Sequence, residues 1–523
     1  MLITLVVATA FAAGLSGVSA VASGSDDGGG SRVRISTGWL QGAAAAEYRS
    51  FQGIPYAAPP VDGLRWRAPR PARSWQGVRD ATQPGQPCVQ LDGDSPRQPP
   101  PLAGSEDCLF LNVTTPREAT GPLPVLVFVH GGGLINESGA AYDPRRIVEQ
   151  NAIVVTLNYR LGALGFLQHP SLHDPFAGNF GLADQQAALR WVRRNIDAFG
   201  GDQHNVTLWG QSAGGATVCA QLAAPGARGL FDKAIVQSAP CGNAVLDRPT
   251  ATSRGLGVAA EVGCSDPNEA ERCLRGTPVA ALVRQADHDQ TFGLLHRRAT
   301  GKPWMPVAGT AALPQQPLTA LRQGTAADVP LIHGGTKDEM RAAVGAVYDF
   351  RGTPVSATEY PKIIHDLFDR DAERILAVYP AADYATPSVA LATLLTDYGA
   401  MIGACSQLPA IDAATRGAPV YAYEYAQPSD RPPVGDFPLG ALHSADLAYF
   451  LDRGSPPLLT PEKEAFADRL IGHWTDFART GDPGPQWPAY GRGTATVLSL
   501  AIDETGPVDL AREHRCGFWS SIR

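Results

Sequence analysis

The sequence predicts an α/β fold with a large, mostly parallel central sheet and helices on both of its faces. The first observation is two near-continuous apolar runs of strand length, at residues 123–129 and 152–158, as expected for strands covered on both faces. The second is a stretch with the spacing of an amphipathic helix, at residues 182–199. The third is another apolar run, which begins at 207–209. This alternation of strands with helices favours a doubly wound sheet.

Length and composition bound the size of the core and the class of partner. A chain of 523 residues, 44% of them hydrophobic, can bury a large core, and its length allows one large domain or three smaller ones. The formal net charge of -8 comes without a basic stripe or a long run of one sign. We therefore expect neither nucleic acid nor an anionic membrane as a ligand.

The N-terminal segment is typical of a processing signal and not of a folded element. Residues 2–18 are apolar or small, and the residues that follow suit cleavage by signal peptidase near Ala20 or Ala22. We therefore expect a signal peptide at 1–22, a flexible linker at 23–30, and a mature protein that is soluble and secreted. The basic segment that normally precedes such a stretch is missing, which leaves a membrane anchor as the alternative.

The chain ahead of the first central strand is expected to be mostly extended segments and turns. Residues 51–57 and the proline-rich stretch 59–72 have this character, and a polar, proline-rich loop follows at 83–104. Residues 106–113 then predict a strand with an acidic start.

A glycine run, His130-Gly131-Gly132-Gly133, directly follows the apolar strand at 123–129. Glycines free successive backbone N–H groups to converge on one point, and such donors stabilise the oxyanion that forms in acyl transfer. The alternative is a glycine-rich loop that only permits close packing. Its position, at the end of a strand and upstream of a Gly-x-Ser-x-Gly motif, favours the oxyanion loop.

That motif surrounds Ser212, where the apolar run 208–215 passes directly into a helix-like segment. Strand, tight turn and helix in this order form a nucleophile elbow, in which flanking glycines let the serine stand clear of the backbone. The same turn points the Ala213 N–H toward a developing oxyanion. The motif alone is a weak signal, because a chain with 56 glycines also produces near-matches in ordinary loops. We expect Ser212 to be a nucleophile and Gly132, Gly133 and Ala213 to be oxyanion donors.

These motifs, with several others, resemble the type-B carboxylesterase family, the cholinesterase-like α/β-hydrolases, in its bacterial secreted branch. The matching stretches follow the family's order across nearly the whole mature chain. They are residues 51–57, 106–113, 158–160, 181–185, 199–202, 210–215, 474–483 and 516–519. The resemblance implies an α/β-hydrolase fold in a single catalytic domain, 31–523, with inserted helical segments over the active site.

The resemblance also implies an acid and a histidine that complete a catalytic triad, in the chain order of this fold. The loop after the strand-like residues 329–333 resembles the family segment whose glutamate orients the histidine. This resemblance assigns Glu339, and its neighbour Asp338 is the rival. His443, on a glycine-bearing loop, matches the family's catalytic histidine. His130 matches a position that supports the oxyanion loop and takes no proton.

The expected reaction is the hydrolysis of a carboxylic ester through an acyl-enzyme intermediate. His443 accepts the proton of Ser212, and Glu339 holds the imidazole and stabilises its charged form. This chemistry requires no metal and no organic cofactor, and the expected partner is a small-molecule ester; the sequence does not address the oligomeric state. A lipase acting on long-chain acylglycerols is the runner-up. A catalytically inactive, cholinesterase-like binding protein is the remote alternative.

Other matched residues are expected to act as scaffold. Two pairs match buried ion pairs of the family, Arg65 with Glu106 and Arg160 with Asp184. Ser238 and Asp446 match positions near the triad.

Eight cysteines, an even number behind an export signal, predict disulfides. The paired short spacings of a zinc site are missing. The resemblance implies three pairs: Cys88 with Cys108, Cys264 with Cys273, and Cys405 with Cys516. Cys219 and Cys241 remain, either bonded to each other across neighbouring elements or present as two buried free thiols.

Two departures from the cholinesterase branch bear on the substrate. That branch carries a tryptophan in the loop closed by its first cysteine pair, where the ring binds a quaternary ammonium, whereas the loop 88–108 here has no aromatic residue. It also places a glutamate directly before the nucleophile, where this chain has Gln211. We therefore expect uncharged esters with short to medium acyl chains, in an acyl pocket with contributors near 238–243 and 303–307.

Overall fold

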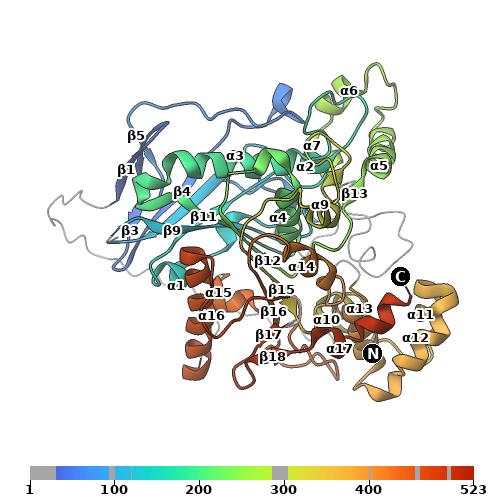
Figure 1. Cartoon of the computed structure of the whole chain (residues 1–523). Coiled ribbons are helices and arrows are strands. Elements are labelled where there is room, and N and C mark those ends of the chain that lie inside the picture. Colours follow the sequence, from blue (N-terminus) through green and yellow to red (C-terminus); the bar gives the residue numbers. More distant parts are fainter. Residues whose placement is uncertain are drawn as a thin grey trace, which may run out of the picture.

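The fold is built on an 11-stranded sheet with the strand order β18-β17-β16-β15-β12-β11-β9-β10-β8-β4-β3 (Figure 1). The computed structural model describes residues 31–92, 100–118, 121–284, 304–399, 402–453, 460–491 and 496–522. The strands of the large sheet are β3 (Ala43–Ala44), β4 (Tyr48–Pro55), β8 (Phe110–Pro116), β9 (Leu123–Val129), β10 (Ile153–Leu157), β11 (Gly201–Gln211), β12 (Lys233–Gln237), β15 (Leu331–Thr336), β16 (Val420–Tyr425), β17 (Val497–Leu500) and β18 (Gly506–Val508). The predicted signal peptide at 1–22 and linker at 23–30 lie outside the described residues.

The central strands of this sheet are parallel. From β17 to β10 in the sheet order every neighbouring pair runs in the same direction. Antiparallel strands, β18 on one side and β8, β4 and β3 on the other, flank them. The prediction of a mostly parallel sheet is therefore confirmed. The carboxyl ends of the parallel strands meet at one edge, where ligands bind in such folds.

Each face of the sheet has its own apolar core, because successive side chains of a strand point to opposite faces. On one face Val127 belongs to the same cluster as buried residues of α3 (Phe180–Asn195) and α4 (Ala213–Ala223). On the other face Phe128 clusters with buried residues of α16 (Pro461–Thr480). Burial from both sides explains why all of β9 is apolar and buried.

A third apolar cluster lies in the segment that connects β15 to β16. It is formed mainly by α10 (Arg341–Val347), α11 (Tyr360–Phe368), α12 (Ala372–Val378), α13 (Pro387–Tyr398) and the C-terminal α18 (Cys516–Ser520). Figure 1 shows these helices to one side of the large sheet. The chain enters this insertion directly after Glu339, so the expected inserted helices are present.

The remaining elements lie outside the large sheet and the third cluster. The other helices are α1 (Arg145–Val148), α2 (Gly162–Phe166), α5 (Arg248–Glu261), α6 (Ala270–Gly276), α7 (Val279–Arg284), α9 (Pro317–Gln323), α14 (Leu408–Ala414), α15 (Leu447–Phe450) and α17 (Leu510–Glu513). The small sheets contain β1 (Arg32–Ile35), β2 (Gly38–Gln41) and β5 (Val78–Asp80), β6 (Gln90–Leu91) with β7 (Leu102–Ala103), and β13 (Leu246–Asp247) with β14 (Val307–Ala308). In the described part of the chain, no helix combines the length and the hydropathy that a bilayer crossing requires.

Two strands differ in extent from the prediction. The strand expected at 106–113 begins only at Phe110, because the acidic start is drawn aside by an ion pair between Glu106 and Arg65. The strand expected at 329–333 begins at Leu331 and continues to Thr336, because β15 pairs with β16 along its whole length. The loop that carries Glu339 is therefore short.

The eight cysteines form four disulfides, and none is free. The pairs are Cys88–Cys108, Cys219–Cys241, Cys264–Cys273 and Cys405–Cys516. The open alternative for Cys219 and Cys241 is thereby decided in favour of a bond, which ties α4 to the loop after β12.

Candidate active site

Ser212 occupies a sharp turn between β11 and α4. Its backbone has φ 56° and ψ -126°, a conformation that costs about 1 to 3 kcal/mol for a residue other than glycine. The turn is held by a hydrogen bond from Ser212 N to Gln237 O in β12, at 2.8 Å. A Cβ atom on Gly214 would lie only 2.1 Å from Val129 O. Glycine is therefore required at position 214, because α4 and β9 approach each other too closely there for any side chain.

Three side chains from distant parts of the chain meet at this turn. Nε2 of His443 lies 2.9 Å from Ser212 Oγ, and its Nδ1 lies 2.5 Å from Glu339 Oε2. The other carboxylate oxygen of Glu339 accepts a hydrogen bond from Thr336 N at 2.8 Å. Glu339 is fully buried. A hydroxyl, an imidazole and an ionisable carboxyl group thus form one continuous hydrogen-bonded chain.

The rival acid, Asp338, has a different role in the same turn. It forms an ion pair with Arg341 at 2.8 Å and accepts a hydrogen bond from Ala441 N at 2.9 Å. Asp338 N in turn donates to Ala441 O. Asp338 therefore fixes the backbone that leads to His443, while the neighbouring Glu339 contacts the ring.

The electrostatic surroundings of His443 favour its charged form. Burial on its own would lower the pKa of His443, but the carboxylate of Glu339 and, less strongly, that of Asp446 outweigh it, so the pKa lies above the ordinary 6.5. Burial and repulsion from Glu339 raise the pKa of Asp446 to about 6. Asp446 accepts a hydrogen bond from Gln237 Nε2 at 2.9 Å. The ring can therefore take up a proton near neutral pH without leaving its position.

The glycine run after β9 lies against the same turn. Gly132 and Gly133 have φ values of 79° and 62°, which glycine adopts at little cost. A Cβ on Gly131 would lie 3.0 Å from Ser212 Cβ. Ala213 is the first residue of α4, whose N-terminus begins beside the serine. The glycine run, at Gly131, and the first residue of α4 therefore both adjoin Ser212.

His130, at the start of this run, is a scaffold residue. Its ring stacks on Tyr159 with 4.5 Å between the centroids, and the Tyr159 hydroxyl donates to His130 O at 2.9 Å. Complete burial lowers the pKa of His130 to about 4. The ring is therefore neutral at physiological pH and supports the loop. The two expected ion pairs are also formed, Arg65 with Glu106 at 2.5 Å and Arg160 with Asp184 at 2.7 Å.

The sequence reasoning missed one contact at the site. Gln211 Nε2 donates a hydrogen bond to Ser444 Oγ at 2.8 Å. The two residues directly precede Ser212 and directly follow His443, and adjacency to those two positions is the signal that could have found them.

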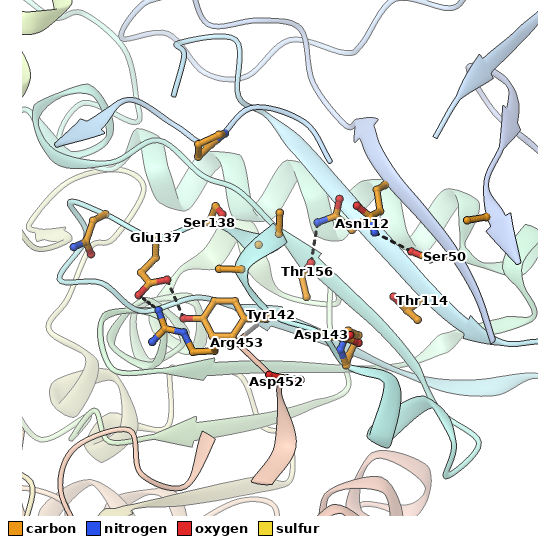
Figure 2. A pocket seen from close by; sticks show the side chains of 18 of the residues that line it. Ser50, Asn112, Thr114, Glu137, Ser138, Tyr142, Asp143, Thr156, Asp452 and Arg453 are labelled. Atoms are coloured by element: carbon orange, nitrogen blue, oxygen red, sulfur yellow. Dashed lines mark hydrogen bonds and ion pairs between the residues drawn. The ribbon is translucent and has the colours of Figure 1, made fainter. Parts of the chain in front are cut away.

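A large cavity among the described residues lies away from Ser212. Figure 2 shows this cavity of about 890 Å³, which borders β4, β8, β10 and the loop that follows Gly133. Glu137 is paired there with Arg453 and accepts a hydrogen bond from Tyr142. Neither Ser212 nor His443 lines it. We therefore do not assign the three meeting side chains to this cavity.

One group of potential metal ligands occurs in the described part of the chain: Cys219, Cys241 and His333. The two sulfur atoms are bonded to each other, so neither is available as a thiolate. His333 Nε2 accepts a hydrogen bond from Cys241 N at 3.3 Å. The group is a structural contact behind the nucleophile helix.

Comparison with known proteins gives the family. The sequence profile of the carboxylesterase family matches residues 30–519. The para-nitrobenzyl esterase of Bacillus subtilis is 32% identical over 515 residues, which cover 92% of this chain and 97% of that protein. The crystal protein of Dictyostelium discoideum is 31% identical over 516 residues, which cover 94% of this chain and 91% of that protein.

Solved structures agree with this assignment. A structure of a PNB esterase superimposes with a TM-score of 0.76 and 30% identity, over 93% of this chain and 99% of its own. A thermophilic PNB esterase gives 0.76 and 29%, with the same coverage. The α/β-hydrolase fold and serine ester hydrolysis are thereby shown, and an inactive binding protein is not supported. The chain belongs to the carboxylesterase family.

Proposed function

We propose that Ser212 is the nucleophile of this ester hydrolase, that His443 is its general base, and that Glu339 orients the histidine. The observation that carries the assignment is the unbroken chain of contacts, 2.9 Å from hydroxyl to imidazole and 2.5 Å from imidazole to carboxylate. An ionised carboxylate can only accept a hydrogen bond, so it selects the tautomer with the proton on Nδ1. Nε2 is then free to accept the proton of Ser212.

The reaction follows from these positions. Ser212 Oγ attacks the ester carbonyl while its proton passes to His443 Nε2, and Glu339 stabilises the imidazolium that results. The tetrahedral intermediate collapses, and the alcohol leaves with the proton from His443. Water then repeats the sequence on the acyl-enzyme, which releases the acid and restores Ser212.

The negative oxygen of each intermediate is assigned to the N–H groups of Gly132, Gly133 and Ala213. In support, Gly131 of the same run packs against the Ser212 side chain, and Ala213 begins α4, whose N-terminus carries a partial positive charge. The loss of one such donor costs about 3 to 4 kcal/mol of transition-state stabilisation in related enzymes. No step of this reaction calls for a metal or an organic cofactor.

The substrates in this proposal are uncharged esters with short to medium acyl chains. Gln211, beside the nucleophile, is neutral, and the loop 88–108 contains no aromatic ring that could bind a quaternary ammonium. The name of the Bacillus subtilis relative likewise refers to an alcohol without net charge. Near the expected acyl pocket, Ser238 is fully buried with φ 53°, and Val307 is fully buried, whereas Pro303 lies outside the described residues.

Ser212→Ala tests the assignment. The variant is expected to fold with an unchanged thermal midpoint, because the Ser212 hydroxyl packs against little, and to lose hydrolysis of p-nitrophenyl butyrate. Hydrolysis by this variant at near the wild-type rate would refute the nucleophile assignment.

A panel of esters from acetate to palmitate, with choline esters alongside, tests the substrate class. A choline ester favoured more than tenfold, or a maximum at palmitate with interfacial activation, would contradict it, and the second outcome would indicate a lipase.

We further propose that residues 31–523 are one catalytic domain and that the protein is exported after removal of residues 1–22, with residues 23–30 as a linker. The support for one domain is that strands from β3 to β18 join a single sheet. The support for export is the four disulfides, which persist in oxidising compartments. N-terminal sequencing of protein from culture medium tests both the export and the cleavage position.

A further inference from the structure

A hydrogen bond joins the direct neighbours of the proposed nucleophile and base. Gln211 ends β11 and precedes Ser212, and Ser444 follows His443. Gln211 Nε2 donates to Ser444 Oγ at 2.8 Å. Gln211 is only 2% exposed and Ser444 is partly exposed, so the bond is partly buried. It connects two loops that also meet through the contacts of His443 with Ser212 and with Gln211.

The side chain of Gln211 touches all three loops of the site. Its Nε2 is bonded to Ser444 and lies 3.4 Å from His443 Nε2. Its Oε1 packs against Gly131, where an added Cβ would lie 3.0 Å away. One buried amide therefore sits between the elbow, the histidine loop and the oxyanion loop.

Ser444 needs such a partner because of its backbone conformation. Its φ of 69° is left-handed, and a residue with a Cβ reaches this region only at a cost. A serine in that conformation persists where its surroundings hold it, and the Gln211 amide is what holds the hydroxyl. The bond thus fixes the backbone turn that follows His443.

Glu339 alone does not fix the position of His443 Nε2. The carboxylate anchors the ring at Nδ1, and a ring held at one atom can still swing about that atom. A second anchor on the adjacent residue limits the swing and so sets the distance from Nε2 to Ser212 Oγ. Because reaction rates fall steeply when reacting groups are misplaced by as little as about 1 Å, this anchor bears on the chemical step.

We infer that Gln211 and Ser444 are positioning residues, which together hold His443 Nε2 against Ser212 Oγ. The inference rests on the proposed function of Ser212 and His443. It predicts that loss of the bond lowers kcat and leaves KM nearly unchanged, because substrate binding does not use the Gln211 to Ser444 contact.

The test compares Ser444→Ala, Gln211→Met and the double variant in purified enzyme. Each single variant is expected to lower kcat about tenfold with KM within twofold. The kcat of the double variant is expected to be no lower than that of the less active single variant, because both substitutions remove the same bond. Ser388→Ala is the matched control: Ser388 is fully buried and accepts a hydrogen bond from Val355 N, so its loss should lower the thermal midpoint and leave kcat unchanged.

Gln211→Glu separates positioning from charge. The carboxylate can still accept a hydrogen bond from the Ser444 hydroxyl, so kcat above pH 9 should stay within threefold of wild type. It also adds a negative charge near His443, which already faces the carboxylates of Glu339 and Asp446. The midpoint of the kcat/KM profile should therefore move upward by about 0.5 to 1 pH unit. Gln211→Glu combined with Ser444→Ala should show the same upward shift of the kcat/KM midpoint, but its kcat above pH 9 should fall as in Ser444→Ala.

The outcomes are distinct. A Ser444→Ala enzyme with kcat within twofold of wild type, or single losses that add in the double variant, would overturn the inference. Ser444 is partly exposed and the substitution is small, so this variant remains informative even where Gln211→Met does not fold. If Ser212→Ala is active, the proposed function itself fails. If Ser212→Ala is inactive and Ser444→Ala is unaffected, only the positioning inference fails.

Discussion

Two histidines of this enzyme, His443 partly exposed and His514 buried, are bound to carboxylates in different ways. At the active site, His443 contacts one carboxylate, Glu339, on Nδ1, and its Nε2 faces the Ser212 hydroxyl. The second site lies beside the C-terminal helices. There His514 contacts Asp397 on Nδ1 and Glu424 on Nε2, each at 2.6 Å.

The number of carboxylates decides what each ring can do. Burial opposes charge on His514, yet the two carboxylates outweigh it and raise its pKa to about 10, so the ring is a cation at neutral pH. It bridges α13 and β16, and neither nitrogen is free. His443, which directly contacts one carboxylate, has a pKa raised above 6.5. Contact with one carboxylate leaves Nε2 of the ring available to act as a base, whereas contact with two carboxylates keeps the ring protonated and fixed in place.

The largest expected effect is on catalysis at the first site. His443→Gln should lower kcat about 10⁶-fold, as removal of the base does in serine hydrolases with this chemistry. The thermal midpoint should stay within a few degrees of wild type, because the ring lies at the surface of the core. Steady-state kinetics and thermal unfolding on the same preparation give both numbers. A loss of only tenfold would mean that another group takes the proton.

Removing the single carboxylate comes next. Glu339→Gln should lower kcat about 10⁴-fold, because an amide can stabilise the wrong tautomer and cannot stabilise the imidazolium. The carboxylate also raises the pKa of His443, so the acid limb of the residual activity should move to lower pH. An acid limb that stays in place would show that Glu339 does not set the pKa of the base.

Replacing the histidine of the second site by glutamine, His514→Gln, should lower the stability of the fold and not the activity. His514→Gln removes the cation shared by two buried carboxylates, of which Asp397 keeps only Arg515 at 3.3 Å. Breaking a buried pair costs about 3 to 5 kcal/mol. Ester hydrolysis per folded molecule should stay within threefold of wild type. Urea unfolding measures the first quantity and active-site titration with an organophosphonate the second. A stable but inactive His514→Gln would place this residue in the catalytic machinery and break the comparison.

The smallest expected effects are on pH dependence. As the pH rises, kcat/KM should increase because of His443, whereas the free energy of unfolding should decrease because of His514. Only neutral His443 acts as a base, so kcat/KM should rise about tenfold per pH unit up to a midpoint above 6.5 and then level off. The folded-state pKa of His514 is raised to about 10 from 6.5. Its stabilisation is therefore complete below pH 6.5 and is lost as the pH rises through about 10.

Unfolding free energies at pH 6, 8 and 10 check this contribution. The wild type should lose stability over that range and His514→Gln should lose less. Equal losses in both proteins would assign the alkaline instability to other groups.

The comparison also shows what the sequence could predict. The strand pattern led to the parallel sheet, and short motifs located Ser212, the glycine loop and, through family resemblance, Glu339 and His443. Local sequence carries these features because a strained turn or a freed N–H group needs particular residues at fixed spacing. The His514 cluster and the contact of Gln211 with Ser444 join segments far apart in the chain, and no local pattern marks them.

The reduction rate of the disulfide between Cys219 and Cys241 can be used to measure local opening of the enzyme. Both residues are almost completely buried, and Cys219 lies on α4, the helix that starts beside Ser212. A reductant in solution reaches these sulfur atoms only while that part of the molecule is open. The rate at which a small thiol reduces this bond, at saturating concentration, is therefore the rate at which α4 and the loop after β12 open to solvent, and it can be read by mass spectrometry.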